Sequence, residues 1–395
     1  MRRYALYVSV CAAAVLFAPA ARTQSPPEAP TGFDNQTNGF LTPEEFEDAQ
    51  GTFEEQEVQD DGLGPVFNAQ SCADCHRNPV TGAISQVTEL RAGRFDPIRG
   101  FVEHPGGSLI NDRAIDAGFQ ERVLVGNEVR TFRTSLNTLG DGFIEAIDSN
   151  TLFAISRGRP PGMRGQFIEV PVLEADGAPR GGRFGWKNQH ASLQSFAADA
   201  YLNEMGITSP LQPTDNTSNG RVVSDGVEDP EDDGADVLAF ANFMRSTKAP
   251  PREEALAATP DARAGSALFD AIGCAVCHVR NITTAPAGTV INRGAFEVPP
   301  ALGGKLIHPF SDFLLHNVGT GDGIVQNGGR STANKLRTPP LWGPRTRSRL
   351  MHDGESLTRN DAILRHGGEF ALVTFTYRLL SNAQREQILT FLDSL

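Results

Sequence analysis

The sequence predicts a mainly α-helical protein built from two modules of one plan, with long loops and a small β insertion in the first module. Three observations support this. Two short motifs, SCADCH at 71–76 and GCAVCH at 273–278, contain four of the five cysteines as two pairs that are 202 residues apart. A segment with a helical apolar period closes each half of the chain. The 40 glycines and 26 prolines among 395 residues indicate many turns between helices.

The first 21 residues have the outline of a secretory signal peptide. Arg2 and Arg3 precede an apolar run at 4–18, and Ala18-Pro19-Ala20-Ala21 resembles a cleavage site. The run is shorter than the roughly 20 residues that a membrane span needs. We therefore expect an exported, periplasmic protein that is not membrane-spanning after cleavage. Cleavage removes Cys11 and changes the formal charge from −13 to −15, which disfavours nucleic acid as a partner.

Each motif has the C-x-x-C-H pattern that is typical of c-type haem attachment. The two cysteines would bond the vinyl groups of one haem, and the next histidine would bind its iron from the proximal side. These residues are Cys72, Cys75 and His76 in the first motif, and Cys274, Cys277 and His278 in the second. The sequence therefore predicts two covalently attached haems.

Three other chemistries compete for the same cysteines. A four-cysteine zinc site does not explain a histidine after each pair. A thioredoxin-like redox pair needs a βαβ pattern, which is missing around both motifs. Disulfides within each pair would close a tight, strained loop.

The domain prediction follows from segments that resemble each other in the two halves. Residues 235–244 and 381–395 both have a helical apolar face, and the second opens with a capping box of Ser381 and Gln384. Opening and closing helices packed over a haem are the plan of cytochrome c. The predicted parts are a signal peptide (1–21), a Pro-rich and then acidic segment (22–50), a first cytochrome c-like domain (51–245), a linker (246–260) and a second such domain (261–395).

Local structure can also be predicted for three segments outside the motifs. The alternating residues 166–173 predict a β-hairpin in the first domain. The acidic loop 224–236 is expected to be solvated. Residues 34–46 have the outline of a calcium loop, with Asp34, Gln36, Asn38, Gly39 and Glu45 at the key positions. Because Gln36 departs from that pattern and no helix precedes it, a turn before a helix is the favoured interpretation.

Several stretches together resemble the di-haem oxidoreductase family: DGLGPVFNAQSCADCH, GRFGWKNQ, LNEMGITSP, PFSDFLLHNVGTG, RTPPLWG, LMHDGES and AILRHGGE. This family is similar to bacterial di-haem cytochrome c peroxidases and to di-haem enzymes that oxidise protein side chains. The resemblance implies one six-coordinate haem that passes electrons and one haem with an open position where hydrogen peroxide or oxygen reacts. An external donor, a small cytochrome or a cupredoxin-type protein, would supply the electrons.

Comparison of the two modules assigns the two roles. Both contain an Arg-Thr pair followed closely by a leucine, RTSL from Arg133 and RTPPL from Arg337, and then a turn and a helix. In the second module that helix ends at His366, which the resemblance makes the candidate distal ligand of the second haem. Met351 is the alternative, with His316 and His352 behind it. The equivalent place in the first module is Ile155-Ser156, which has no ligating side chain, so the first haem is expected to be open.

The resemblance also implies a distal glutamate that exchanges protons with peroxide, and Glu145 is the candidate. A glutamate favoured by a helix N-terminus is the structural interpretation of the same residue. Trp186 and Trp342 are the two indoles that could relay electrons between the haems. The predicted function is peroxide reduction at the first haem; a pure electron carrier and an enzyme that oxidises a protein or organic substrate are the alternatives.

Overall fold

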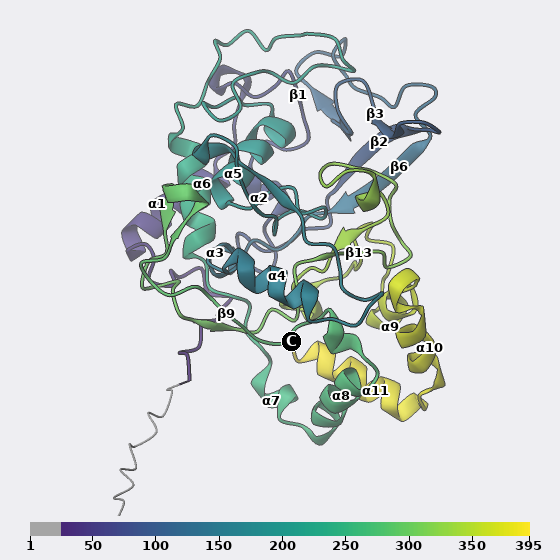
Figure 1. Ribbon diagram of the computed structural model, residues 1–395. Coiled ribbons are helices and arrows are strands. Elements are labelled where there is room, and N and C mark those ends of the chain that lie inside the picture. The colour runs from purple at the N-terminus through teal and green to yellow at the C-terminus, as the bar shows by residue number, and fades with distance from the viewer. Residues whose placement is uncertain (1–24) are drawn as a thin grey trace, which may run out of the picture.

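The structure, a computed structural model, describes residues 25–395 (Figure 1). The predicted signal peptide and Cys11 lie outside the described residues. The helices are α1 (Pro43–Glu54), α2 (Cys72–Cys75), α3 (Asp141–Glu145), α4 (Ser149–Arg157), α5 (Leu193–Ala200), α6 (Ala235–Ser246), α7 (Glu254–Ala257), α8 (Pro260–Ala271), α9 (Arg359–Leu364), α10 (Ala371–Leu379) and α11 (Asn382–Asp393). A π-helix, Tyr201–Met205, continues α5 and ends at Gly206, whose φ is 83°.

Most strands are short and pair antiparallel with one partner. They are β1 (Val66–Phe67), β2 (Thr88–Asp96), β3 (Gly100–Glu103), β4 (Leu109–Ile110), β5 (Arg113–Ala114), β6 (Val129–Thr134), β7 (Glu169–Val172), β8 (Ala178–Gly181), β9 (Ile282–Thr283), β10 (Val290–Ile291), β11 (Phe296–Glu297), β12 (Leu306–Ile307), β13 (Leu315–His316) and β14 (Leu336–Arg337). The protein is mixed, 32% helical and 16% strand, so the prediction of a mainly α protein is not confirmed.

The β structure of the first half is larger than expected. The hairpin predicted at 166–173 is present as β7 and β8, with Val170 opposite Arg180. In addition, β2 pairs with β6 and with β3 and β4 in a four-stranded sheet, which Figure 1 shows at the opposite end of the molecule from α8 and α11. Its central strand, TELRAGRFD, mixes charged and apolar residues without a period of two. This strand therefore escaped a prediction based on alternation.

Local signals explain where the principal helices begin. Thr42 and Glu45 form a capping box before α1, and Ser381 and Gln384 form one before α11. Thr259 caps α8, whose first residue is a proline, as in α1. The Glu45 carboxylate accepts a hydrogen bond from the backbone N–H of Thr42 at 2.9 Å, so it caps helix α1. This is a different use from the twelfth position of a calcium loop.

Helix pairs enclose the two motifs. α1 packs on α6 beside the first motif, and α8 packs on α11 beside the second. The contact of α8 with α11 is so close that a Cβ on Gly265 would lie 1.8 Å from the carbonyl oxygen of Gln387.

One hydrophobic core joins the two predicted domains. Phe143 and Phe240 from the first half share a cluster with Val298, Phe313 and Trp342 from the second. A smaller cluster around Phe269, Tyr377 and Phe391 lies between α8, α10 and α11. Residues 281–313 therefore pack against the first half of the chain, and the second half owns only a small core of its own.

Within residues 25–395, no helix has the length and apolarity required to cross a bilayer.

Candidate haem sites

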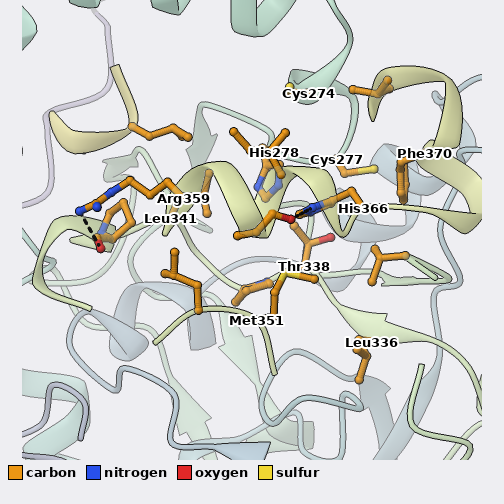
Figure 2. A pocket seen from close by; sticks show the side chains of 18 of the residues that line it. Cys274, Cys277, His278, Leu336, Thr338, Leu341, Met351, Arg359, His366 and Phe370 are labelled. Carbon is orange, nitrogen blue, oxygen red and sulfur yellow. Dashed lines mark hydrogen bonds between the residues drawn. The ribbon is translucent and has the colours of Figure 1, made fainter. Parts of the chain in front are cut away.

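The second motif borders a deep cavity between the C-terminal helices and β14. The cavity has about 1430 Å³ of empty space, its open mouth included. Cys274, Cys277 and His278 form one wall, and α9 with the turn that follows it forms another. Phe269 of α8 packs against the His278 ring, with ring centroids 6.0 Å apart. Figure 2 shows the labelled cysteine, histidine and methionine side chains around this one space.

Two imidazoles face each other in this cavity. The ring centroids of His278 and His366 lie 6.5 Å apart. The Nδ1 atom of His278 contacts the Phe310 carbonyl at 2.8 Å, and the Nδ1 atom of His366 contacts the Ala362 carbonyl at 2.7 Å. Metal-bound histidines usually direct their second nitrogen to such a partner. Both Nε2 atoms are left for another bond, and metal–imidazole bonds of about 2 Å suit two rings at this separation.

Burial also keeps these imidazoles neutral, as metal binding requires. It lowers the pKa of His278 to about 4, with the neighbouring His366 ring adding to the effect. Burial likewise lowers the pKa of His366, although its backbone hydrogen bond opposes this. Both rings therefore carry a free lone pair at neutral pH.

The structure separates the alternatives to His366. Met351 also lines the cavity, from a backbone with φ of 66°. His352 lines it too and packs edge-on against Trp186, with centroids 6.1 Å apart. His316 is engaged on both nitrogens, by Asp312 at 2.9 Å and Glu369 at 3.0 Å. A histidine with both nitrogens occupied has no lone pair to offer.

The first motif borders a second cavity of similar size, about 1370 Å³ with its mouth. Cys72, Cys75 and His76 line it, and the His76 Nδ1 atom contacts the Ala83 carbonyl at 3.2 Å. Phe53 from α1 packs on the His76 ring, with centroids 6.4 Å apart. The two motifs therefore present the same donor set, but the supporting phenylalanine comes from different places in the two halves.

The far side of the first cavity differs from that of the second. Among the described residues that line it, His76 is the only histidine. Two methionines, Met205 and Met244, also reach this lining. The RTSL stretch from Arg133 borders the first cavity, as the RTPPL stretch from Arg337 borders the second.

A polar wall of the first cavity contains a carboxylate pair that the sequence did not reveal. Arg91 donates to Glu89 at 2.8 and 2.9 Å, and both line the cavity. Glu204, which lines it as well, accepts a hydrogen bond from Asn68 at 2.8 Å. Burial opposes ionisation of Glu89, but Arg91 holds its pKa below the ordinary value. Burial and the nearby Glu89 charge raise the pKa of Glu204, which favours a proton on that carboxyl group.

The predicted acid–base residue, Glu145, lies elsewhere. It is fully buried and does not belong to the lining of the first cavity. Arg245 donates to both of its oxygens, at 2.7 and 3.1 Å, and the Leu193 N–H donates at 2.9 Å. Burial would raise the pKa of Glu145, but the Arg245 charge holds it below its ordinary value. Asp141, one helical turn earlier on α3, does line the cavity, and burial raises its pKa to about 8.

Of the two indoles, only Trp186 lines both cavities. Its Nε1 donates to the Thr134 carbonyl at 2.8 Å, and its own carbonyl accepts the Arg337 N–H at 2.8 Å. Trp186 is therefore held between the RTSL stretch from Arg133 and the RTPPL stretch from Arg337. Trp342 lines only the second cavity, with its Nε1 donating to the His308 carbonyl at 2.8 Å.

These observations narrow the alternatives for the cysteines. The two pairs line different cavities, so they do not assemble a four-cysteine zinc site. Cys72, Cys75, Cys274 and Cys277 form no disulfide. Burial raises the pKa of all four thiols, which disfavours the thiolate that zinc or redox chemistry needs. Paired neutral thiols beside an imidazole, at the edge of a deep cavity, fit a haem attached through thioethers.

The fold and its two cavities thus define a protein with two sites of one donor pattern. A family model described as "Di-haem oxidoreductase, putative peroxidase" matches residues 112–395. This range is well over half of the chain, so the chain belongs to that family, and membership implies haem cofactors. The matched range contains the second motif and begins after the first.

Comparisons with other proteins add the following. No match was found among curated proteins. Among solved structures, the chain is similar to Kuenenia stuttgartiensis hydrazine synthase under xenon, at 15% identity and a TM-score of 0.41, over 99% of this chain and 100% of that one. It is also similar to a MauG-like protein associated with microbial copper homeostasis, at 14% identity and a TM-score of 0.43, over 97% and 95% of the chains.

Proposed function

We propose that this protein is an exported, periplasmic di-haem peroxidase that reduces hydrogen peroxide in the first cavity and receives electrons through the second. The observation that supports this most is the asymmetry of the two cavities. His278 is faced by a second imidazole. In the first cavity, His76 is the only histidine among the described lining residues, and the carboxyl groups of Glu89 and Glu204 line the same cavity. A haem that only transfers electrons can have a protein ligand on both faces, whereas a haem that reacts with peroxide needs one position free.

In this proposal each motif attaches one haem covalently. Cys72 and Cys75 hold the first haem and Cys274 and Cys277 the second. His76 and His278 are the proximal ligands, and His366 is the distal ligand of the second haem. The bound haems supply the iron chemistry of peroxide reduction. The protein residues hold the group, exclude water and move protons.

The carboxyl groups that line the first cavity supply the protons for peroxide reduction. Reduction of one hydrogen peroxide to two waters takes two protons and two electrons. Glu204, whose carboxyl group retains its proton, is the donor in this proposal, and the Glu89–Arg91 pair holds the negative charge beside it. Such a positioned carboxyl group contributes about 10²–10⁴-fold to a proton-transfer step. It takes the place in the mechanism that the sequence assigned to Glu145.

Electrons from a small cytochrome or cupredoxin-type donor enter at the second cavity and pass to the first. Trp186 is the relay, because it is the indole that borders both cavities. His278 and His366 would both bind the iron of the second haem, and two imidazole ligands favour a low-spin electron carrier.

Electron paramagnetic resonance of the purified ferric holoprotein tests the proposal. We expect one high-spin and one low-spin haem, and peroxide consumption with a reduced donor. Glu204→Gln should lower the turnover rate about 10²-fold or more while leaving the spectrum unchanged. The exposed Glu47→Gln is the matched control.

A specific observation favours an electron carrier as the second candidate, since Met205 and Met244 could cap the first haem. Two low-spin signals and no peroxide turnover would support that function and exclude the peroxidase.

A further inference from the structure

Four acidic side chains of the long segment between α5 and α6 lie close together, outside both haem cavities. They are Asp215, Asp225, Asp229 and Glu231, and we call them the acidic cluster. Part of the cluster falls in the loop at 224–236 that the sequence predicted to be merely solvated. The structure instead folds this loop back onto the chain that leads to the first motif.

The segments around the cluster hold it in place. Thr208 donates its N–H to Glu231 and its hydroxyl to Asp229, both at 2.8 Å. A Cβ built on Gly62 would lie 2.5 Å from the Cγ of Glu231, and one built on Gly64 would lie 3.6 Å from the Cβ of Asp225. Asp225 and Glu231 therefore pack against the 62–64 segment, and Thr208, just after the π-helix, holds Glu231 and the exposed Asp229.

The spacing of the carboxylates suits one metal ion. Asp215, Asp229 and Glu231 each offer one oxygen, and these three oxygens lie within 4.8 Å of one another. Ca²⁺ binds oxygen ligands at about 2.3–2.6 Å, so two ligands of one ion are at most about 5 Å apart. The three oxygens satisfy this limit.

An independent observation is that several oxygens of the cluster are buried without a partner. Asp225 is only 5% exposed, and its Oδ2 atom has no hydrogen bond. Asp215 Oδ1 and Glu231 Oε1 are also buried and unpartnered. An unpaired buried carboxylate destabilises a fold unless a cation or donor reaches it.

The charges around the cluster are of one sign. Burial and then the charges of Asp229, Asp225 and Glu231 raise the pKa of Asp215 to about 7. Burial and the Asp225 charge also raise the pKa of Glu231, against the hydrogen bonds from Thr208. The Asp225 charge thus acts on both of these carboxyl groups.

We propose that the acidic cluster binds a calcium ion. Oxygen-only ligands exclude the metals that prefer sulfur or imidazole. Carboxylates drawn from a loop suit the flexible coordination of Ca²⁺ better than the strict octahedron of Mg²⁺. The ion ties the 215–231 loop to the 62–64 segment just before the first motif. It also supports the start of α6, which Asp232 caps through the N–H groups of Gly234 and Asp236.

The test uses the full-length holoprotein, stripped with EDTA, and measures ⁴⁵Ca²⁺ binding together with the thermal midpoint in CaCl₂ or MgCl₂. We expect one high-affinity Ca²⁺ per chain, a thermal midpoint that rises with Ca²⁺ concentration, and a smaller effect of Mg²⁺. Asp215→Asn with Glu231→Gln should weaken Ca²⁺ binding at least tenfold. The exposed Glu228→Gln, in the same loop, should bind as the wild type does.

A second variant keeps the test decisive if the first folds poorly. Asp225→Asn should raise the thermal midpoint in EDTA, because it removes one repelling charge. The same variant should show a smaller rise in thermal midpoint when Ca²⁺ is added. Absence of Ca²⁺ binding by the wild type would overturn the proposal. So would equal binding by the double variant, which would place the ion elsewhere, for instance at residues 34–46, or an equal response to Mg²⁺. All of these results are independent of peroxidase activity.

Discussion

At the scale of single residues, the two cavities share one set of cysteine and histidine donors and differ in the side chains that line the rest of each cavity. The motif residues line two cavities as expected, because C-x-x-C-H places its three donors within one turn of chain. The His366 ring lies 6.5 Å from the His278 ring between centroids, and its role as a ligand stays a prediction. Glu145 does not reach the first cavity, and Glu89 and Glu204, from a strand and a π-helix far apart in sequence, line it instead. Sequence spacing alone carries no information on such long-range approach.

The first prediction concerns His366. His366→Ala should remove the low-spin signal of the second haem, because the facing imidazole is lost, and added imidazole should restore it. Met351→Leu is the matched control from the same cavity and should leave the signal intact. Retention of the signal in His366→Ala together with its loss in Met351→Leu would transfer the ligand role to the methionine.

The second prediction concerns the buried pair of Glu145 and Arg245. Glu145→Gln should lower the free energy of unfolding by about 3–5 kcal/mol at pH 7, because it leaves a buried guanidinium unpaired. Glu145→Gln with Arg245→Leu should cost less than Glu145→Gln alone. Urea titration followed by circular dichroism measures both.

The pH dependence of this pair has a definite sign. The pKa of Glu145 in the fold lies below its ordinary value of 4.5. Its contribution to stability is therefore fully present above pH 4.5 and is lost as the pH falls through the lower pKa of the folded state. The stability difference between wild type and Glu145→Gln should shrink in acid below pH 4.5; a difference that stays constant there would contradict the assignment.

At the scale of elements, helices with capping signals were predicted well. The helix closing each half is present as α6 and α11. Strands β2 and β6 were missed because their sequences lack the usual alternation of polar and apolar residues; Glu89, Arg91 and Arg133 of these strands line the first cavity. A phenylalanine lies five residues before the first cysteine of each motif, but the two side chains pack differently. Phe269 lies on α8 against His278, but Phe67 lies in β1, and Phe53 from α1 takes its role.

The third prediction tests the contact of α8 with α11. Gly265→Ala should destabilise the protein by about 1–3 kcal/mol, because the added methyl group would overlap the Gln387 carbonyl. The midpoint of chemical denaturation measures the loss. Gly51→Ala on α1, where a Cβ meets nothing within 4 Å, is the matched control. It should be neutral or stabilising by about 0.5–1 kcal/mol; equal effects at both sites would refute the close contact.

At the scale of the whole molecule, the two halves are more tightly joined than a linker between domains suggests. A single core contains residues of both halves. The buried Asp322 binds Arg133 at 2.7 Å and Lys187 at 3.2 Å, which links the second half to the first. Trp186 lies where these halves meet and borders both cavities. The rigid junction keeps the two candidate haem sites in one fixed relation.

The fourth prediction concerns this junction. Trp186→Phe should slow electron transfer between the haems on the order of tenfold, equivalent to about 1.4 kcal/mol of barrier. Stopped-flow absorbance of the second haem after peroxide addition measures the rate. Trp342→Phe changes an indole that lines only the second cavity and should leave the rate unchanged. Equal rates in Trp186→Phe and the wild type would remove the relay role.

Several features are local along the chain and follow from the sequence alone: the two donor motifs, the capped helices and the hairpin at 166–173. Each depends on residues within a few turns of one another, where spacing dictates geometry. Three features came from the folded chain: which carboxylates reach the first cavity, that Trp186 borders both cavities, and that oxygens of Asp215, Asp229 and Glu231 lie within 4.8 Å of one another. These contacts join segments more than a hundred residues apart or loops without periodic signals, and their positions follow from packing of the whole chain.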